Sequence, residues 1–292
     1  MRPILHIILL LLFMASGAAV AQTAFANQGD DKKVTDESEW RAGIQYTSDY
    51  YYMGRADSAT APYLSPSIAY YHKSGVSLRS SLSYLTASGE GRVDLFTLSG
   101  GYDYFGVKVA TGISIAEYIF SDESYAIQAE MSTYLNAYVG YDFSAFMVYA
   151  DASLGFSEGT DLFLGAEINR SFYAMRNKLR ITPAMYINAG SQRYYNEYYT
   201  QRSTQTGSGK GKGMGAAQPA PQSVRLTESD KFQVLDYEAD VQVSYSIGNI
   251  RIYISPTWTF PINPSTVVSD QGVYEEDLKN GFYWSSGIRF TF

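Results

Sequence analysis

The sequence predicts an all-β fold: a closed, antiparallel, up-and-down transmembrane β-barrel of about twelve strands. Three observations indicate this fold. From Trp40 onward, apolar and polar residues alternate along segments of about ten residues, the length of a tilted strand that crosses a bilayer. Beyond the N-terminal segment, no apolar run approaches the ~18 residues of a transmembrane helix. Short and longer links alternate between the segments, as they do in membrane barrels.

The first 21 residues have the features of a cleaved signal peptide. Arg2 provides a positive start, residues 4–14 form an apolar run, and residues 19–21 (A-V-A) are an A-x-A cleavage site. Residues 24–26 (A-F-A) are a second possible site, so cleavage after Ala21 or five residues later stays open. Residues 22–39 are polar and charged, and we expect them to form a flexible periplasmic lead-in.

The alternation is clearest in residues 178–189, where apolar side chains occupy every second position and polar ones the positions between. In a helix these charges would spread around the axis, whereas a strand places them on one side. Residues 127–139 and 250–260 follow the same pattern. We therefore expect Ile127 and Met131 to lie on the apolar, lipid-facing side of a sixth strand.

The spacing of the links predicts the topology. Tight links fall at residues 71–75, 104–106, 142–144, 174–177 and 247–249. The links between them are often longer and cover residues 50–62, 121–124, 191–230 and 263–280. Because outer-membrane barrels have short periplasmic turns and longer outside loops, both chain ends are expected in the periplasm. Residues 203–222, rich in Gly, Ser, Lys, Ala and Pro, are expected to be a disordered extracellular loop.

The polar faces of the strands are the candidate lining of the lumen. The charged candidates are Arg41, Arg79, Glu130, Asp151, Glu167, Arg180, Asp240, Arg251 and Arg289. Charges in a confined lumen are costly unless they are paired or hydrated. The mixed signs therefore indicate ion pairs across the lumen or a narrow wet passage. A soluble β-sandwich is the alternative fold, but its polar faces would look into bulk water.

The last segment, residues 281–292, alternates and ends on the aromatic Phe292. Its apolar face carries Phe282, Trp284, Ile288, Phe290 and Phe292. A terminal aromatic residue on such a strand resembles the signal by which bacterial outer-membrane barrels are recognised for assembly. The resemblance implies an integral outer-membrane protein whose partners are outer-membrane lipid and the barrel assembly machinery.

A second resemblance lies in residues 47–54, which read T-S-D-Y-Y-Y-M-G and are followed by Arg55. They resemble the end of the first strand in a family of small, porin-like bacterial barrels of unassigned function, in which S-D-Y is followed shortly by R-G. Here Met53-Gly54 stands in that place, and the similarity fades after about residue 104. The resemblance implies the barrel class and no activity. The tyrosines are interpreted as an interface girdle, with a ligand platform as the alternative.

Residues suited to catalysis or metal binding are few. The chain has no cysteine, and after signal cleavage its one histidine is His72, in a tight link. A lone turn histidine does not resemble the Ser/His pair of the outer-membrane phospholipases, so we expect no enzyme, cofactor or metal. The acidic residues 275–277 could offer oxygen ligands to Ca²⁺ but are interpreted as a solvated cluster. A net charge of −7 argues against a nucleic-acid-binding surface.

Two functions remain open at this stage. The leading hypothesis is a narrow porin-like passive channel for small hydrophilic solutes, because a twelve-stranded barrel is intermediate in size between side-chain-filled and open types. The alternative is a non-conducting barrel that displays extracellular loops for binding or serves envelope structure. A hydrolase that depends on His72 is disfavoured.

Overall fold

The computed structural model describes residues 37–57, 59–89, 91–197, 225–227, 229–269 and 272–292. The expected signal peptide, most of the expected lead-in and the expected disordered loop at residues 203–222 lie outside this described part. Among the described residues, no helix is long and apolar enough to span a membrane.

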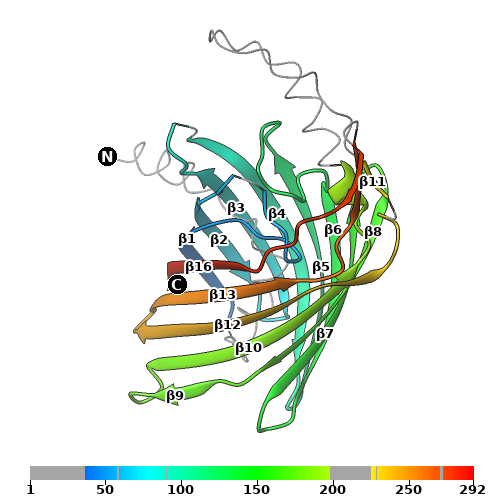
Figure 1. The fold of residues 1–292 in the computed structure, drawn as a ribbon. Coiled ribbons are helices and arrows are strands. Elements are labelled where there is room, and N and C mark those ends of the chain that lie inside the picture. The colour runs from blue at the N-terminus through cyan, green and yellow to red at the C-terminus, as the bar shows by residue number, and fades with distance from the viewer. Residues whose placement is uncertain (1–36, 58, 90, 198–224, 228, 270–271) are drawn as a thin grey trace.

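Twelve long strands form a closed ring in which each strand pairs antiparallel with both neighbours (Figure 1). They are β1 (Glu39–Thr47), β2 (Tyr63–Tyr71), β3 (Val76–Leu85), β4 (Arg92–Phe105), β5 (Val109–Phe120), β6 (Thr133–Asp142), β7 (Met147–Phe156), β8 (Thr160–Asn169), β10 (Leu179–Gly190), β12 (Gln233–Ile247), β13 (Ile250–Pro261) and β16 (Gly281–Thr291). The short β9 (Phe172–Ala174) pairs with the start of β10. The predicted twelve-stranded up-and-down barrel is confirmed.

The ring closes where the two ends of the barrel sequence meet. β16 pairs with β1 from Arg41 opposite Thr291 to Thr47 opposite Ser285. Beyond that ladder, the amide of Phe292 donates to the carbonyl of Trp40 at 2.8 Å. Closure leaves neither strand with an open edge, which would otherwise pair with other chains.

The links divide the barrel into two ends. At the short-turn end, residues 72–75, 106–108, 143–146, 175–178 and 248–249 connect neighbouring strands. At the long-loop end, three further strands, β11 (Arg225–Thr227), β14 (Thr266–Ser269) and β15 (Gly272–Glu275), form a separate small sheet. A short helix over residues 193–197 lies at the same end.

The outer surface of the ring is apolar. Between a third and two thirds of the surface of many large side chains is exposed, among them Ile113, Ile115, Leu164, Met185 and Ile254 in the middle of their strands. Aromatic residues flank this band at the short-turn end (Trp40, Tyr102, Tyr104, Tyr141) and at the long-loop end (Tyr84, Tyr237, Trp258, Phe282). Soluble monomers rarely expose so much contiguous apolar surface, whereas an apolar band between aromatic girdles is typical of transmembrane barrels.

The sixth strand is shorter than predicted. β6 begins at Thr133, and residues 121–132 form a link that contains two successive turns. Ile127 and Met131, predicted to face lipid, are instead fully buried, with 0% and 1% of their surface exposed. The link predicted at residues 121–124 therefore extends to residue 132, because a buried link can alternate by chance as a strand does.

Candidate functional site: the barrel interior

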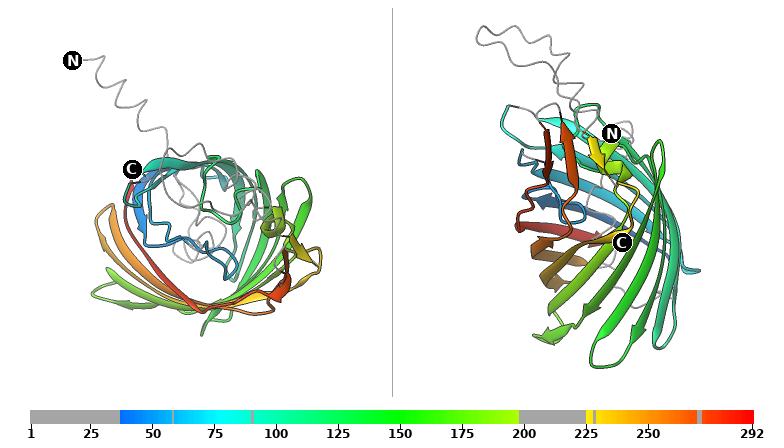
Figure 2. Two further views of the ribbon diagram at one scale, coloured as in Figure 1. Left: turned by 45° about the horizontal axis from the view of Figure 1, so that its top comes forward. Right: turned by 45° about the vertical axis from the view of Figure 1, so that its right-hand side comes forward.

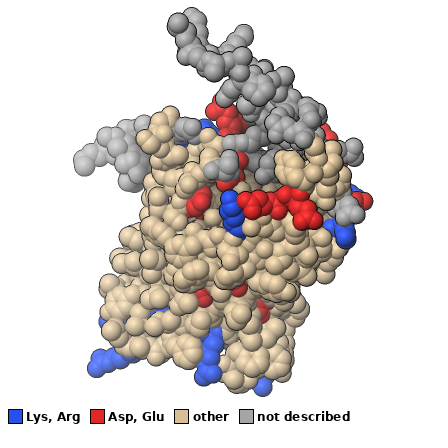
Figure 3. Space-filling model, viewed as in Figure 1, with Lys and Arg blue, Asp and Glu red and all other residues tan. Residues whose placement is uncertain are grey.

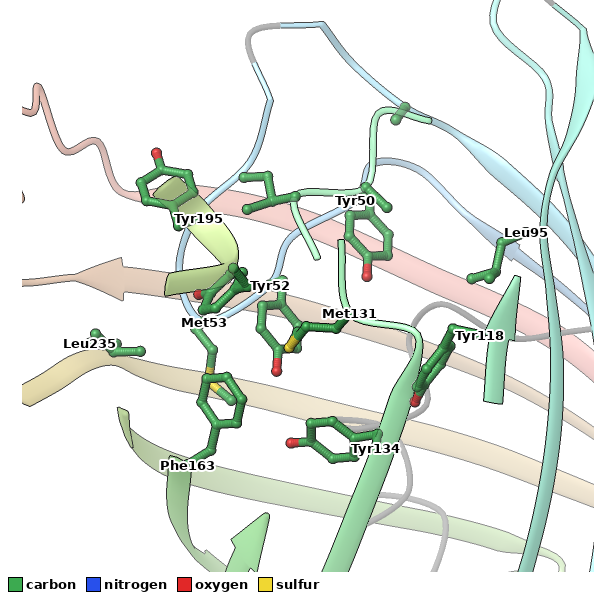
Figure 4. Close-up of a cluster of buried hydrophobic side chains, with 14 of the residues drawn as sticks. Tyr50, Tyr52, Met53, Leu95, Tyr118, Met131, Tyr134, Phe163, Tyr195 and Leu235 are labelled. Carbon is green, nitrogen blue, oxygen red and sulfur yellow. The ribbon is translucent and has the colours of Figure 1, made fainter. Parts of the chain in front are cut away.

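The interior at the long-loop end is filled by three links that fold inward, and we call them the plug. The plug consists of residues 49–55 between β1 and β2, residues 126–131 between β5 and β6, and residues 191–195 after β10. Together with inward side chains of the wall, these residues form the main buried hydrophobic cluster of the described chain (Figure 4). Figure 2 shows the β1–β2 link, in blue, inside the ring of strands.

Tyr52 lies at the centre of the plug, with 2% of its surface exposed. Its ring meets Phe163 edge-on at 5.9 Å between centroids and Tyr194 at 5.3 Å. Phe163 belongs to β8, which is separated from β1 by four strands along the shorter arc of the ring. The β1–β2 link therefore crosses the lumen. The interface girdle predicted for these tyrosines was wrong for Tyr50 and Tyr52, which are buried inside the barrel.

Gly54 and Arg55, which follow the run of tyrosines after β1, belong to a tight turn. The backbones of Tyr52 and Arg55 exchange hydrogen bonds of 2.8 and 3.1 Å, which closes a tight turn. Within that turn Gly54 has φ +76°, and a Cβ at this position would lie 2.7 Å from Cβ of Asp236. Only glycine combines a left-handed backbone with so close an approach.

Arg55 is buried, with only 3% of its surface exposed. It anchors the β1–β2 link to the β10–β12 and β13–β16 links. Its Nε lies 3.3 Å from Oε1 of Glu276, and its guanidinium donates to the carbonyls of Met53 (3.2 Å) and Asn263 (3.3 Å). The ring centroid of Tyr195 lies 5.6 Å from the guanidinium carbon. A buried charge is tolerated only with such partners, so the pairing fixes the plug in one position.

Carboxylates hold the remaining parts of the plug. Asp161 accepts hydrogen bonds from the amides of Arg193 (2.9 Å) and Tyr194 (2.8 Å), and so binds the start of the short helix. Asp94 accepts from the hydroxyls of Ser121 (2.7 Å) and Ser124 (2.8 Å) in the β5–β6 link. These bonds satisfy groups that would be costly to bury without a partner.

Asp49 performs the same task at the base of the β1–β2 link. Its Oδ1 accepts from the amides of Tyr50 and Ala61, each at 2.8 Å, which joins the two sides of the link. Burial raises the pKa of Asp49 above its ordinary value, and the two backbone hydrogen bonds oppose that rise.

The middle of the inner wall carries carboxylates on β7, β8 and β12. Glu167 on β8 is 4% exposed; Oε1 accepts from Nδ2 of Asn169 at 2.5 Å, and Oε2 has no hydrogen-bond partner within the described structure. Asp240 on β12 accepts from Ser255 Oγ at 2.6 Å, and Asp151 on β7 from Ser153 Oγ at 3.4 Å. In the described part of the chain, no group of three or more His, Cys, Asp or Glu is arranged to hold a metal ion.

Arginines gather on the inner wall at the short-turn end, and we call them the arginine arc. Its members are Arg41 on β1, Arg79 on β3, Arg180 on β10, Arg251 on β13 and Arg289 on β16. Each lies within four residues of the short-turn end of its strand. Their five strands lie along one continuous arc of seven strands, from β10 through β12, β13, β16, β1 and β2 to β3.

Several contacts hold the arc. Arg41 pairs with Glu39, whose Oε1 lies 2.6 Å from Arg41 Nε, and Arg79 pairs with Asp103 at 3.4 Å. The Tyr71 ring lies between these two arginines, with guanidinium carbons 4.2 and 5.5 Å from its centroid. Arg180 donates to Oε1 of Gln242 at 3.4 Å and Arg251 to Oγ of Ser246 at 3.3 Å.

The structure places eight of the nine predicted charged residues on the inner wall, and the exception is Glu130. Glu130 lies in the β5–β6 link, where burial first and then Glu197 and Glu158 raise its pKa. That these residues line a conducting passage stays a prediction. Sequence reasoning did not predict that Tyr52, Arg55 and Glu276 lie together inside the barrel. Gly54, next to Arg55, was the one signal of a tight turn.

A closed antiparallel barrel with an apolar, girdled exterior and a polar inner wall is the architecture of bacterial outer-membrane proteins. The chain is an integral outer-membrane β-barrel. No family model matches it, and no curated protein does.

Several solved structures are similar in fold. A KdgM porin is 12% identical with a TM-score of 0.45, covering 86% of this chain and 99% of that one. LpxR from Salmonella typhimurium is 10% identical with a TM-score of 0.45 and the same coverages. The translocator domain of autotransporter NalP from Neisseria meningitidis is 9% identical with a TM-score of 0.44, covering 93% and 95%. At these identities the likeness concerns the fold alone.

Proposed function

We propose that this barrel is non-conducting in its resting state and presents a fixed binding surface at its long-loop end. The short-turn end, where β1 begins and β16 ends, then faces the periplasm. The observation that carries the proposal is the plug, because Tyr52 packs against Phe163 and Tyr194 across the lumen.

The long-loop surface has two features that suit recognition. The sheet of β11, β14 and β15 and the short helix are tied to the plug through Arg55, Glu276 and Asp161, so these described parts of the surface are held together. A surface that needs little ordering on binding loses less affinity to conformational entropy. On the face seen in Figure 3, acidic residues gather in the upper half, and several lysines and arginines line the lower edge.

Planar-bilayer recording of the purified, unmodified barrel tests this proposal. We expect no reproducible conductance steps and no solute-driven swelling of liposomes that contain the barrel. Steady single-channel steps in the unmodified protein would contradict it. A large porin in the same lipid serves as the positive control for insertion and recording.

The second candidate is a narrow porin-like passive channel for small hydrophilic solutes, closed by the plug and opened when the plug moves. Partial exposure of the inner wall at the short-turn end favours it: 26% of the Arg79 side chain and 13% of Asp103 are accessible. Water therefore reaches the wall below the plug. Conductance that appears only after the plug is loosened would support this candidate over a permanently closed barrel.

We also propose that the barrel has no catalytic activity. His72, the histidine of the described chain, is exposed in a short turn, with Nδ1 2.8 Å from Oγ of Ser74. Ser74 is exposed as well, so this hydroxyl and imidazole are solvated and are not held as a nucleophile and its base. The check is hydrolysis of phospholipid and peptide substrates, and activity that is lost in His72→Ala would contradict the proposal.

A further inference from the structure

We propose that the arginine arc binds a multivalent oxyanion, a ligand with two or more carboxylate or phosphate groups, that enters from the short-turn end. The proposal does not depend on whether the barrel conducts. It rests on how the strands bring like charges together on the inner wall, and on the access of solvent to that wall.

Arg251 and Arg289 are direct cross-strand partners in the β13–β16 ladder. Both lie on the inner face, where opposed Cβ atoms of antiparallel strands are about 4.5–5.5 Å apart. This register places two guanidinium groups side by side on the inner wall, where a single ligand can reach the donors of both.

The charge continues along the wall. Arg289 lies opposite Gly43 on β1, so Arg41, two residues away on the same face, is its diagonal neighbour. Arg41 and Arg79 then share the Tyr71 ring. The arc thus runs without interruption from β13 to β3. Within the arc, Glu39 pairs with Arg41 and Asp103 pairs with Arg79.

The wall beside the opposed pair is built of small residues. Gly43 lies opposite Ser67 on β2, and Ala69 lies opposite both Arg41 and Arg79. Solvent reaches this part of the interior, because the Arg41 and Arg79 side chains are 14% and 26% exposed. The surface is therefore accessible to a dissolved ligand, in contrast with the plug.

The chemistry of arginine selects the ligand class. A guanidinium presents a planar fork of donors that matches a carboxylate or phosphate with two parallel hydrogen bonds. Two forks side by side suit a ligand that carries two oxyanion groups. The turns at the same end add exposed positive charge at Lys73, Lys108 and Lys178, which attracts anions toward the mouth.

Calorimetric titration of the detergent-solubilised barrel with inorganic pyrophosphate, and separately with citrate, tests the proposal. We expect saturable binding that weakens as NaCl is raised, because charge carries the interaction. Arg289→Gln should weaken binding about tenfold or more, the effect of losing one charge-assisted hydrogen bond. Lys108→Gln is the matched control: it removes the same charge at the same end, from an exposed turn, and should leave affinity within about twofold.

Thermal unfolding provides a second readout that a merely structural role would not reproduce. Pyrophosphate or citrate should raise the unfolding temperature of the unmodified barrel but not of Arg289→Gln. Binding of one anion and not the other supports the proposal and identifies phosphate or carboxylate as the preferred group. Absence of binding of both anions, or equal weakening by Lys108→Gln, overturns it.

Discussion

Replacing Arg55 by methionine should release the plug. The substitution keeps an apolar stem of similar length and removes only the guanidinium. It breaks the 3.3 Å ion pair with Glu276 and leaves that carboxylate, whose side chain is 13% exposed, without its cation. Removing one partner of a buried ion pair costs about 3–5 kcal/mol. Because Glu276 keeps hydrogen bonds from Tyr195 (2.7 Å) and Ser265 (3.1 Å), we expect about 3 kcal/mol.

A loss of about 3 kcal/mol shifts the equilibrium between the seated and displaced plug by a factor on the order of one hundred. Two assays report it: the open fraction in planar bilayers, and the rate at which added protease cleaves the β1–β2 link. Lys279→Met is the control, since Lys279 forms an exposed ion pair with Asp277 at the same end, with side chains 80% and 82% exposed. The double variant Arg55→Met/Glu276→Leu removes the stranded carboxylate as well and should recover most of the loss.

Two results would refute this reasoning. If Arg55→Met and Lys279→Met behave alike in both assays, the ion pair of Arg55 with Glu276 does not hold the plug. If Arg55→Met exposes the link to protease but no conductance appears, the plug moves and the rest of the lumen is closed. The second result would exclude the gated channel and leave the non-conducting barrel.

Three further predictions address the turn, the lipid face and pH. Gly54→Ala should destabilise the β1–β2 link by about 1–2 kcal/mol, measured as faster proteolysis, because its φ is +76° and a Cβ would contact Asp236. Ile254→Lys, on the outward face near the middle of β13, should cost about 2–4 kcal/mol in urea unfolding from lipid, and unchanged stability would contradict a lipid-facing band. Glu130→Gln should raise the unfolding temperature near pH 8 and leave it unchanged near pH 4, because burial and Glu197 raise the Glu130 pKa, so ionisation destabilises the folded link as pH rises. An equal effect at both pH values would show that this charge is not responsible.

Local geometry explains why much of the fold was predictable. Successive residues of a strand point to opposite faces, so alternation alone assigned Arg180, Asp240, Arg251 and their counterparts to the inner wall. Link lengths then set the strand number and the two ends. The same rule failed at residues 127–131, where a buried link of two turns has an alternating composition.

The contents of the lumen could not be predicted in this way. The tyrosines after β1 would suit a membrane interface or an interior equally well, because both surround an aromatic ring with apolar groups. The structure shows that Tyr52 lies in the barrel interior, where its ring packs against Phe163 and Tyr194, two partners that are remote in sequence. Pairing of Arg251 with Arg289 likewise depended on the exact register of two strands.

The sequence by itself determined that this chain is a twelve-stranded membrane barrel, which side of most strands faces lipid, and that the segment ending at Phe292 closes the ring. These properties follow from the period of a strand and the thickness of a bilayer, which act over about ten residues. Only the tertiary structure decided that the links fold inward at the long-loop end, and that arginines gather at the short-turn end. The physical reason is that these features depend on contacts such as Arg55 with Glu276, 221 residues apart, which no local pattern encodes.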